Sequence, residues 1–281
     1  MERKLNNYMS KEIRNSITEK AEKLWGEDLH KNKLNSQHFI QLKNIFLTHW
    51  DRELKGDFLE IGCGTGADLE YFLKIKNLKT VTAIDIGKNI DDLKKKYKMY
   101  SHANIIRASA LNLPFEKNKF NIVYSFGVFH HTENPTKCIE ESYRVLKKNG
   151  VIFLYLYSAH EDIFFKRLGI LFEKKLMQVY KSISYSNQNK ISGVLSPICW
   201  LIFTVPSRIL ELIGLKKFSK KIPFFFGTHP FSLINDLKDR LMAPVNHRFE
   251  KNEIKDILES YKFKEIKIEK NSSGLYIFAK K

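Results

Sequence analysis

Between residues 57 and 158 the chain alternates short apolar runs with longer amphipathic stretches. The apolar runs are DFLEIG (57–62), TVTAID (80–85), ANIIRA (103–108), FNIVYSF (120–126) and GVIFLYLYS (150–158). Stretches with helical spacing lie between them, near 66–76, 88–99 and 134–147. Apolar strands separated by connections of helical length predict βαβ units, and hence an α/β fold whose parallel sheet is covered on both faces.

The C-terminal residues resume this pattern after a long interruption. EKNEIKDILESYKF (250–263) predicts an amphipathic helix, and KEIKIEK (264–270) and GLYIFAKK (274–281) predict two final strands that pair antiparallel. We therefore expect a Rossmann-like, doubly wound, mostly parallel seven-stranded sheet whose last strand is antiparallel.

The same patterns divide the chain into four parts. Residues 1–50 have apolar positions spaced mostly by three or four and predict an N-terminal helical cap, which is followed by the sheet-forming core at 51–158. Residues 159–245 are aromatic-rich, mostly helical in pattern and interrupted by prolines, so they predict an inserted helical lid. Residues 246–281 complete the core.

The most hydrophobic stretch lies inside the predicted lid. GVLSPICWLIFTV (193–205) is shorter than the ~20 apolar residues that span a bilayer, and it contains Pro197, so we expect no transmembrane span. It is either a buried helix of the lid or an interfacial segment that makes peripheral membrane contact through 193–221. Five basic residues follow it: Arg208, Lys216, Lys217, Lys220 and Lys221.

The net charge of +17 raises the question of a polyanionic partner. Lysines far outnumber arginines, and no arginine-rich, aromatic-interleaved stripe is present. We therefore interpret most of the charge as solvated surface lysine and do not favour a nucleic-acid partner, although the alternative stays open.

The cysteines and the N-terminus bear on the compartment. Cys63, Cys138 and Cys199 lie far apart with no C-x-x-C spacing, which indicates neither a disulfide framework nor a zinc site, and we expect no metal. The first twenty residues are polar and have no hydrophobic signal region. A cytoplasmic location, with peripheral membrane contact as the alternative, is the expectation.

The first chemical motif is FLEIGCGTGADLE (58–70), where a strand turns into a helix. Glycines at such a turn let backbone amides approach a ligand closely. The spacing of Gly62, Gly64 and Gly66 is one residue tighter than the dinucleotide fingerprint, and Glu60 precedes it. A carboxylate there disfavours a pyrophosphate and suits a ligand with a cationic amino group.

Further motifs follow at the ends of the next two predicted strands. Asp85 is placed to accept both hydroxyls of an adenosine ribose, and Ile86 can pack on the adenine face. Ser109 and Ala110, in RASALNLPF (107–115), should reach the adenine edge.

Together with FNIVYSFGVFHHTENPTKCIEESYRVLKKNGVIFL (120–154), these motifs resemble the class I S-adenosylmethionine-dependent methyltransferases, particularly the small-molecule and lipid-type members. The resemblance covers about 57–158 and resumes at 249–281. It implies S-adenosylmethionine (SAM) as cofactor, with the glycines curving beneath its methionine portion, Glu60 holding its amino group through water and Asp85 holding its ribose. Ser109 stands where many relatives have aspartate, so the adenine contact is weakened or passes to the backbone and Ala110.

The resemblance also implies that Ser125 and Phe126 face the methionine end of the cofactor. Methyl transfer from a sulfonium needs mainly alignment and exclusion of water, which can contribute about 7–11 kcal/mol. A general base helps where the acceptor is a hydroxyl, and His130 and His131, after the fourth strand, are the candidates. Relatives commonly carry a histidine in this loop that is not catalytic.

The acceptor is constrained by a missing motif. SFGV (125–128) replaces the Asn/Asp-Pro-Pro-aromatic motif of the relatives that methylate exocyclic or amide nitrogens. We therefore expect a methyltransferase that acts on a small-molecule, sugar or lipid-linked acceptor, at oxygen. Two alternatives stay open: an RNA methyltransferase that uses the basic surface, and a non-catalytic membrane-associated protein with the same fold.

Overall fold

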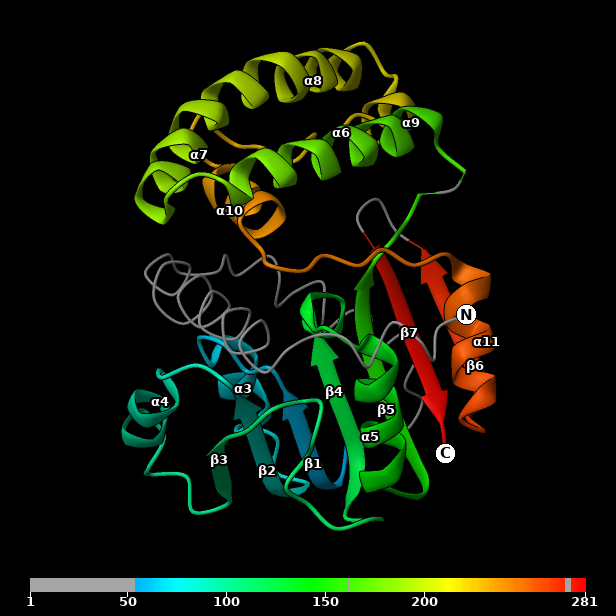
Figure 1. Ribbon diagram of the computed structural model, residues 1–281. Coiled ribbons are helices and arrows are strands. Elements are labelled where there is room, and N and C mark those ends of the chain that lie inside the picture. Colours follow the sequence, from blue (N-terminus) through cyan, green and yellow to red (C-terminus); the bar gives the residue numbers. More distant parts are fainter. Residues whose placement is uncertain (1–53, 161, 271–273) are drawn as a thin grey trace. The chain divides into compact units, whose positions relative to one another are not determined.

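The computed structural model describes residues 54–160, 162–270 and 274–281, and the helical cap expected over residues 1–50 lies outside them. The chain forms two compact units. The core comprises the chain up to Tyr157 together with Lys251–Lys281, and the inserted unit is Ser158–Glu250. Figure 1 shows both along the coloured ribbon, and each is described by itself below.

The core is built on a seven-stranded sheet of order β3-β2-β1-β4-β5-β7-β6. Its strands are β1 (Gly56–Ile61), β2 (Leu78–Asp85), β3 (Ala103–Arg107), β4 (Phe120–Phe126), β5 (Leu146–Tyr157), β6 (Lys264–Lys270) and β7 (Gly274–Lys280). The first five pair in parallel, and β7 lies antiparallel between β5 and β6. The predicted sheet, including its antiparallel last strand, is confirmed.

The helices of the core follow the strands in alternation. They are α3 (Ala67–Phe72), α4 (Ile90–Lys96), the short 3₁₀ helix η4 (Phe129–His131), α5 (Pro135–Val145) and α11 (Lys251–Ser260). Helix α5 begins where the sequence supplies a cap: the Asn134 side chain accepts a hydrogen bond from the Lys137 amide, and Pro135 opens the first turn.

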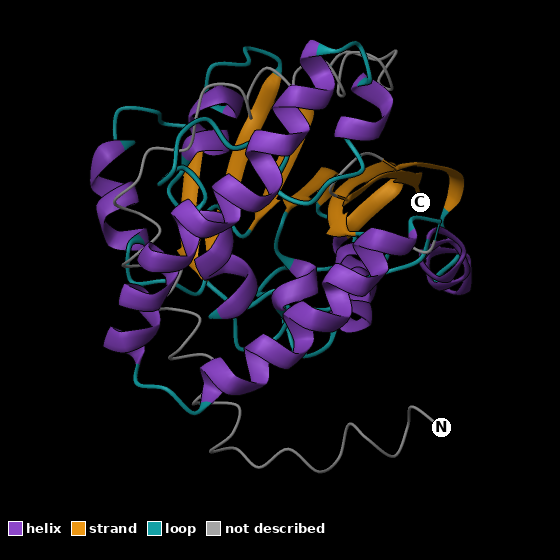
Figure 2. Ribbon diagram, turned by 90° about the horizontal axis from the view of Figure 1, so that it is seen from above, coloured by secondary structure: helices purple, strands orange, loops and turns teal. Residues whose placement is uncertain are grey.

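Both faces of the sheet are covered. Phe58 and Leu59 are successive residues of β1, so their side chains point to opposite faces, and both are fully buried. On one face Phe58 and Tyr124 pack with Phe72 of α3, with ring centroids 4.1 and 5.0 Å from the Phe72 ring. Figure 2 shows the strands with helices around them. This double covering explains why the strands read as continuous apolar runs.

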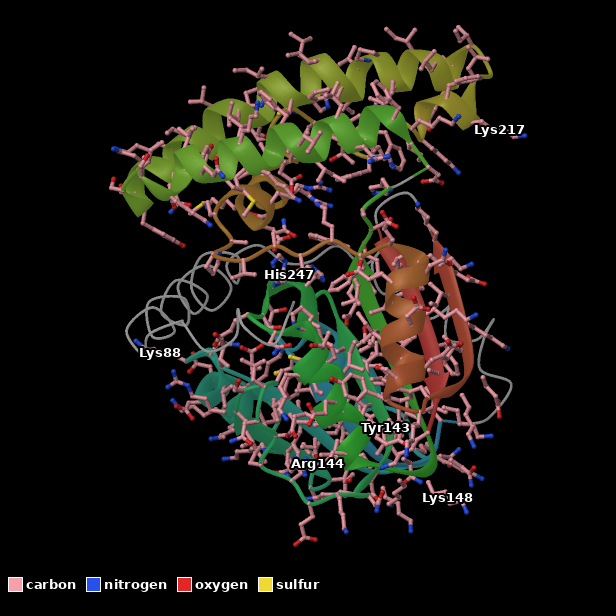
Figure 3. All side chains as sticks on the ribbon, turned by 45° about the vertical axis from the view of Figure 1, so that its right-hand side comes forward. Lys88, Tyr143, Arg144, Lys148, Lys217 and His247 are labelled. Carbon is pink, nitrogen blue, oxygen red and sulfur yellow. The ribbon has the colours of Figure 1, made fainter. Side chains whose placement is uncertain are left out.

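Arg144 shows how helix α5 is fastened to the core. Its guanidinium donates to the carbonyls of Phe115 and Leu113 at 2.6 and 2.9 Å and pairs with Glu141 at 2.7 Å. The Glu141 carboxylate in turn accepts from the Leu113 amide at 2.8 Å, and the Arg144 hydrogen bond lowers its pKa. The labelled Arg144 lies on the lower part of the core in Figure 3.

The inserted unit is helical. Its helices are α6 (Phe164–Lys181), α7 (Tyr185–Cys199), the π-helical segment η5 (Trp200–Thr204), α8 (Val205–Leu212), α9 (Lys216–Ser219) and α10 (Ile234–Leu241). The chain enters and leaves the unit side by side, because the Ala159 amide donates to the Phe249 carbonyl at 2.9 Å. Helix α10 contacts both α6 and α7.

Helices α7, η5 and α8 form one continuous helix of 28 residues, Tyr185–Leu212. It is long and apolar enough to cross a membrane by length and composition, and little of it is buried. The helix is therefore longer than the apolar stretch 193–205, and the expectation that it does not span a membrane stays a prediction. The helix continues on both sides of the apolar stretch and tolerates Pro197 in its interior, with η5 immediately after it.

Candidate functional site

The loop after β1 requires each of its three glycines. Gly62, Gly64 and Gly66 have φ values of 80°, 46° and 74°, in the left-handed region. A Cβ on Gly62 would overlap the Val128 side chain, and one on Gly66 would lie 2.7 Å from Leu93 Cδ2. A Cβ on Gly64 would meet no atom of the described residues within 4 Å. Gly62 and Gly66 therefore allow close packing, whereas Gly64 presents bare backbone to open space.

Asp85 holds this loop against the end of β2. One carboxylate oxygen accepts from the Gly64 amide at 2.9 Å, and the other accepts from the Gly87 amide at 2.8 Å. The Asn89 side-chain amide donates to the Gly64 carbonyl. A carboxylate has about four acceptor positions, so these two bonds fix Asp85 and leave lone pairs for ribose hydroxyls.

Glu60 is a buried carboxyl group at the carboxyl end of β1. It is 2% exposed, and its Oε2 has no hydrogen-bond partner among the described residues. Burial, together with the nearby charges of Asp68 and Asp85, raises the pKa of Glu60 well above its ordinary value. A buried acceptor without a donor costs stability unless a ligand supplies the donor, so Glu60 suits a cationic amino group.

The expected adenine side of the site lies in the loops after β2 and β3. The Ser109 hydroxyl accepts from the Leu111 amide at 3.2 Å, and Ala110 is buried. Arg107 donates to the Ile86 carbonyl at 2.8 Å, which ties the two loops together. The Ser109 hydroxyl thus shapes its own turn, and its contact with adenine stays a prediction.

Ser125, at the end of β4, is expected to face the methionine end of the cofactor, and that contact stays a prediction. Its hydroxyl donates to the Ile61 carbonyl at 3.0 Å and is buried between two strands, so its side chain serves the sheet. The Phe126 ring stacks on Tyr155 with centroids 4.3 Å apart. The next residue, Gly127, has a φ of 76°, and among residues 54–160, 162–270 and 274–281 nothing lies within 4 Å of a Cβ added to it.

Gly127 and Asn89 were not anticipated as site residues. Both could have been noticed: Gly127 is the glycine directly after a strand in SFGV, and Asn89 follows AIDIGK at the start of a helix. Strands β1 and β4 are parallel neighbours, so the loops of Gly64 and Gly127 follow the same edge of the sheet. Gly64 and Gly127 thus leave bare backbone on two neighbouring loops, which a ligand can approach closely.

His130 and His131 lie in η4, directly after β4. Both are buried, and the His130 ring stacks on Tyr157 at the end of β5 with centroids 3.9 Å apart. The His131 ring is 4.2 Å from that of His130. The structure brings the two histidines to the same edge of the sheet as the glycine loops, and a role as general base stays a prediction.

These residues fit SAM. The bare glycines admit close approach of a ligand, the unsatisfied Glu60 oxygen fits its amino group, and the fixed Asp85 carboxylate fits its ribose. Within the described ranges, no group of three or more His, Cys, Asp or Glu side chains is arranged to hold a metal ion.

Residues 59–154 match the family model described as "Methyltransferase domain". The matched segment runs from β1 to β5 and so contains the glycine loop, Asp85 and both histidines. With the sheet order and the site geometry, this match defines the class. Over residues 59–154 the core therefore matches the SAM-dependent methyltransferases.

Particular relatives share this core. The chain is 25% identical over 134 residues to cycloartenol-C-24-methyltransferase 1 of Oryza sativa subsp. japonica, covering 46% of this chain and 37% of that protein. It is 26% identical over 148 residues to demethylmenaquinone methyltransferase of Staphylococcus epidermidis, covering 51% of this chain and 60% of that protein. The chain thus spans less than two thirds of the length of either relative.

Among solved structures, the citrinin polyketide synthase CMeT domain is similar with a TM-score of 0.51 at 12% identity. The match covers 97% of this chain and 57% of that one. At this identity the likeness shows the fold alone.

Proposed function

We propose that this protein transfers the methyl group of SAM to an oxygen of a small-molecule, sugar or lipid-linked acceptor. The observation that carries the proposal is the Gly62–Gly66 loop held on the Asp85 carboxylate, together with a Glu60 oxygen that has no partner in the described part of the chain. A loop with bare glycine and two acidic groups suits a phosphate-free adenosine with a cationic amino-acid tail.

The residues of the chain have positioning roles in this proposal. When bound, SAM supplies a methyl group on a sulfonium, which is already activated for displacement. Asp85 orients the ribose and Glu60 the amino group, while the bare backbone at Gly64 and Gly127 allows close contact. Fixing the methyl group in line with the acceptor is the main contribution that such a site can make.

An oxygen acceptor requires that a proton be removed. His130 and His131 are the candidates, because both follow β4 directly and lie at the edge where open α/β sheets bind ligands. A general base at this point would accelerate the reaction by about 10²–10⁴-fold. Tyr157, which stacks on His130, would fix the plane of that ring.

The acceptor class is supported by two observations. The names of two relatives cite small molecules rather than nucleic acids, namely a cycloartenol, methylated at carbon C-24, and a demethylmenaquinone, and they support the acceptor class but not the oxygen. The inserted unit departs from the chain directly after β5 and returns directly before α11, so it is tethered at the carboxyl end of a core strand. Additions at that edge commonly determine specificity.

The test is transfer of a trideuteromethyl group from labelled SAM to separated pools of polar metabolites, lipids and RNA. We expect labelled products in the metabolite or lipid pool with the full chain and none with Asp85→Ala. Fragmentation of the product shows whether the label is on oxygen or carbon. Label in the RNA pool, or no label in any pool, would contradict the proposal.

A further inference from the structure

The long helix Tyr185–Leu212 of the inserted unit has its polarity reversed relative to a helix of a water-soluble protein. The residues of this helix that are fully buried are small and hydroxyl-bearing: Ser192, Ser196, Thr204 and Ser207. A surface helix in water normally buries its large apolar residues and exposes its polar ones. Here four hydroxyl-bearing side chains face the unit, and many of the large apolar side chains are exposed.

The buried hydroxyls are engaged within the unit. Ser196 donates to the Pro230 carbonyl at 2.7 Å, and Thr204 donates to the Phe224 carbonyl at 2.6 Å. Arg208 donates to the Gly227 carbonyl at 2.6 Å. The segment 222–231, which has no regular secondary structure, is thus bound to one face of the helix through its backbone carbonyls, and that face cannot turn outward without breaking these bonds.

The opposite face of the helix is apolar and exposed. Its large side chains are between 46% and 86% exposed: Val194, Ile198, Leu201, Ile202, Ile209 and Leu212. Their spacing of mostly three, four and seven places them along one side of the helix. Such a continuous apolar surface marks a site of interaction with a membrane or another protein.

The charge of the surrounding sequence indicates which of these partners fits. Between residues 174 and 235 the chain has nine Lys and Arg residues and a single acidic residue, Glu211. Lys216, Lys217, Lys220 and Lys221 follow the helix directly and are exposed. The labelled Lys217 projects from the end of this unit in Figure 3. We call Lys216, Lys217, Lys220 and Lys221 the basic rim. A cluster of positive charge next to an apolar face complements a surface of anionic lipid headgroups.

We propose that the exposed face of Tyr185–Leu212, which we call the outer face, docks in the plane of an anionic lipid bilayer. The inference does not rest on the proposed methyl transfer. A spanning orientation is disfavoured because it would carry Arg208 and the irregular segment 222–231, which is bound to the helix, into hydrocarbon. When the helix lies parallel to the bilayer surface, its outer face enters the acyl region. The side that carries Ser196 and Thr204 stays hydrogen-bonded to the rest of the inserted unit.

Vesicle flotation of the full chain tests this proposal, with phosphatidylcholine vesicles that either contain or lack phosphatidylglycerol. We expect flotation with the anionic vesicles and much less with the neutral ones. The double variant Leu201→Gln/Ile202→Gln should weaken partitioning by about tenfold or more, since it withdraws two aliphatic side chains from lipid. Met99→Gln, which alters an exposed apolar residue of the core, is the matched control and should bind like the wild type.

The basic rim is tested separately. Lys216→Gln and Lys217→Gln should each weaken partitioning to anionic vesicles by about fivefold and leave the weak binding to neutral vesicles unchanged. Circular dichroism melting of each variant shows that it is folded, which separates loss of docking from loss of structure.

Three results would overturn the proposal. The first is no flotation of the folded wild type, or flotation that the double variant leaves unchanged. The second is retention on vesicles after extraction at alkaline pH, which indicates a spanning helix. The third is a dimer in size-exclusion chromatography that dissociates in Leu201→Gln/Ile202→Gln, which would assign the outer face to a second copy of the chain.

Discussion

The sheet of the core and the long helix of the inserted unit bury opposite kinds of residue. In the core, Phe58, Tyr124 and Phe72 lie inside against one another, and the charged residues of α4 lie outside. In the long helix of the inserted unit, Ser196 and Thr204 lie inside and large aliphatic side chains lie outside. The exposed residues of α4 in the core are thus charged, as expected for a surface in water. The long helix of the inserted unit instead exposes an apolar surface that fits an apolar partner on one side.

This difference separates two tasks. The loops at one edge of the core sheet carry the acceptors and bare glycines that fit a polar, cationic cofactor. The inserted unit carries the apolar outer face and most of the prolines. We infer that the core carries the methyl donor and that the inserted unit sets the environment in which the protein works.

The largest effect is expected from the glycine loop of the core. Gly62→Ala should lower the free energy of unfolding by about 2–4 kcal/mol, because it adds a clash with Val128 to an unfavourable left-handed backbone. Gly64→Ala should cost only about 1–2 kcal/mol, since its Cβ meets none of the residues that the structure describes, but should weaken SAM binding. Urea denaturation and cofactor titration of both variants measure this contrast. Equal stability losses would contradict it.

The next effect concerns Asp85. Asp85→Ala removes a carboxylate that holds two loop amides, and we expect about a 100-fold loss of SAM affinity. Equilibrium dialysis with labelled SAM measures the loss. Asp91→Ala removes an exposed carboxylate of α4 and is the matched control, which should bind SAM normally. An unchanged affinity of Asp85→Ala for SAM would show that Asp85 does not contribute to the SAM site.

A smaller effect is expected from the buried carboxyl of Glu60. Its pKa is raised in the folded chain, so the unfolded chain ionises first, and the folded state loses stability as pH rises above the ordinary value of 4.5. Glu60→Gln lacks this loss and should melt at a higher temperature than the wild type, with a difference that grows from acidic to neutral pH. Melting curves in the absence of cofactor measure it, and a difference that shrinks with rising pH would contradict the assignment.

The smallest effects on stability are expected from substitutions in the long helix of the inserted unit. Ser196→Val leaves the Pro230 carbonyl without its donor and should cost about 1 kcal/mol of stability. Ile202→Gln changes only the outer face and should stay within about 0.5 kcal/mol of the wild type in water. Thermal denaturation of both variants compares the stability lost on the buried side of the helix with the stability lost on its outer face. A larger loss from Ile202→Gln would show that the outer face is covered by protein.

Much of the core could be predicted from the sequence. The strands read clearly because both faces of the sheet are covered, as at Phe58 and Leu59, which leaves long apolar runs between helical stretches. The glycine loop was visible because its backbone conformation demands glycine. Gly127 was missed because a single glycine after a strand has many possible uses.

The remaining features depend on side-chain contacts that a linear pattern does not contain. The Ser125 hydroxyl bonds to the Ile61 carbonyl, and only the pairing of β1 with β4 reveals that partner. The length of the helix at Tyr185–Leu212 was underestimated because prolines at 197 and 206 were interpreted as interruptions. Its reversed polarity became visible only when the buried side of the helix was known.

The most direct test of the account is a calorimetric titration of the wild-type chain with SAM. We predict saturable binding at one site per chain that is lost or strongly weakened in Asp85→Ala and retained in Asp91→Ala. Absence of saturable binding by the folded wild-type chain would contradict the central claim that the Gly62–Gly66 loop and Asp85 form a SAM site.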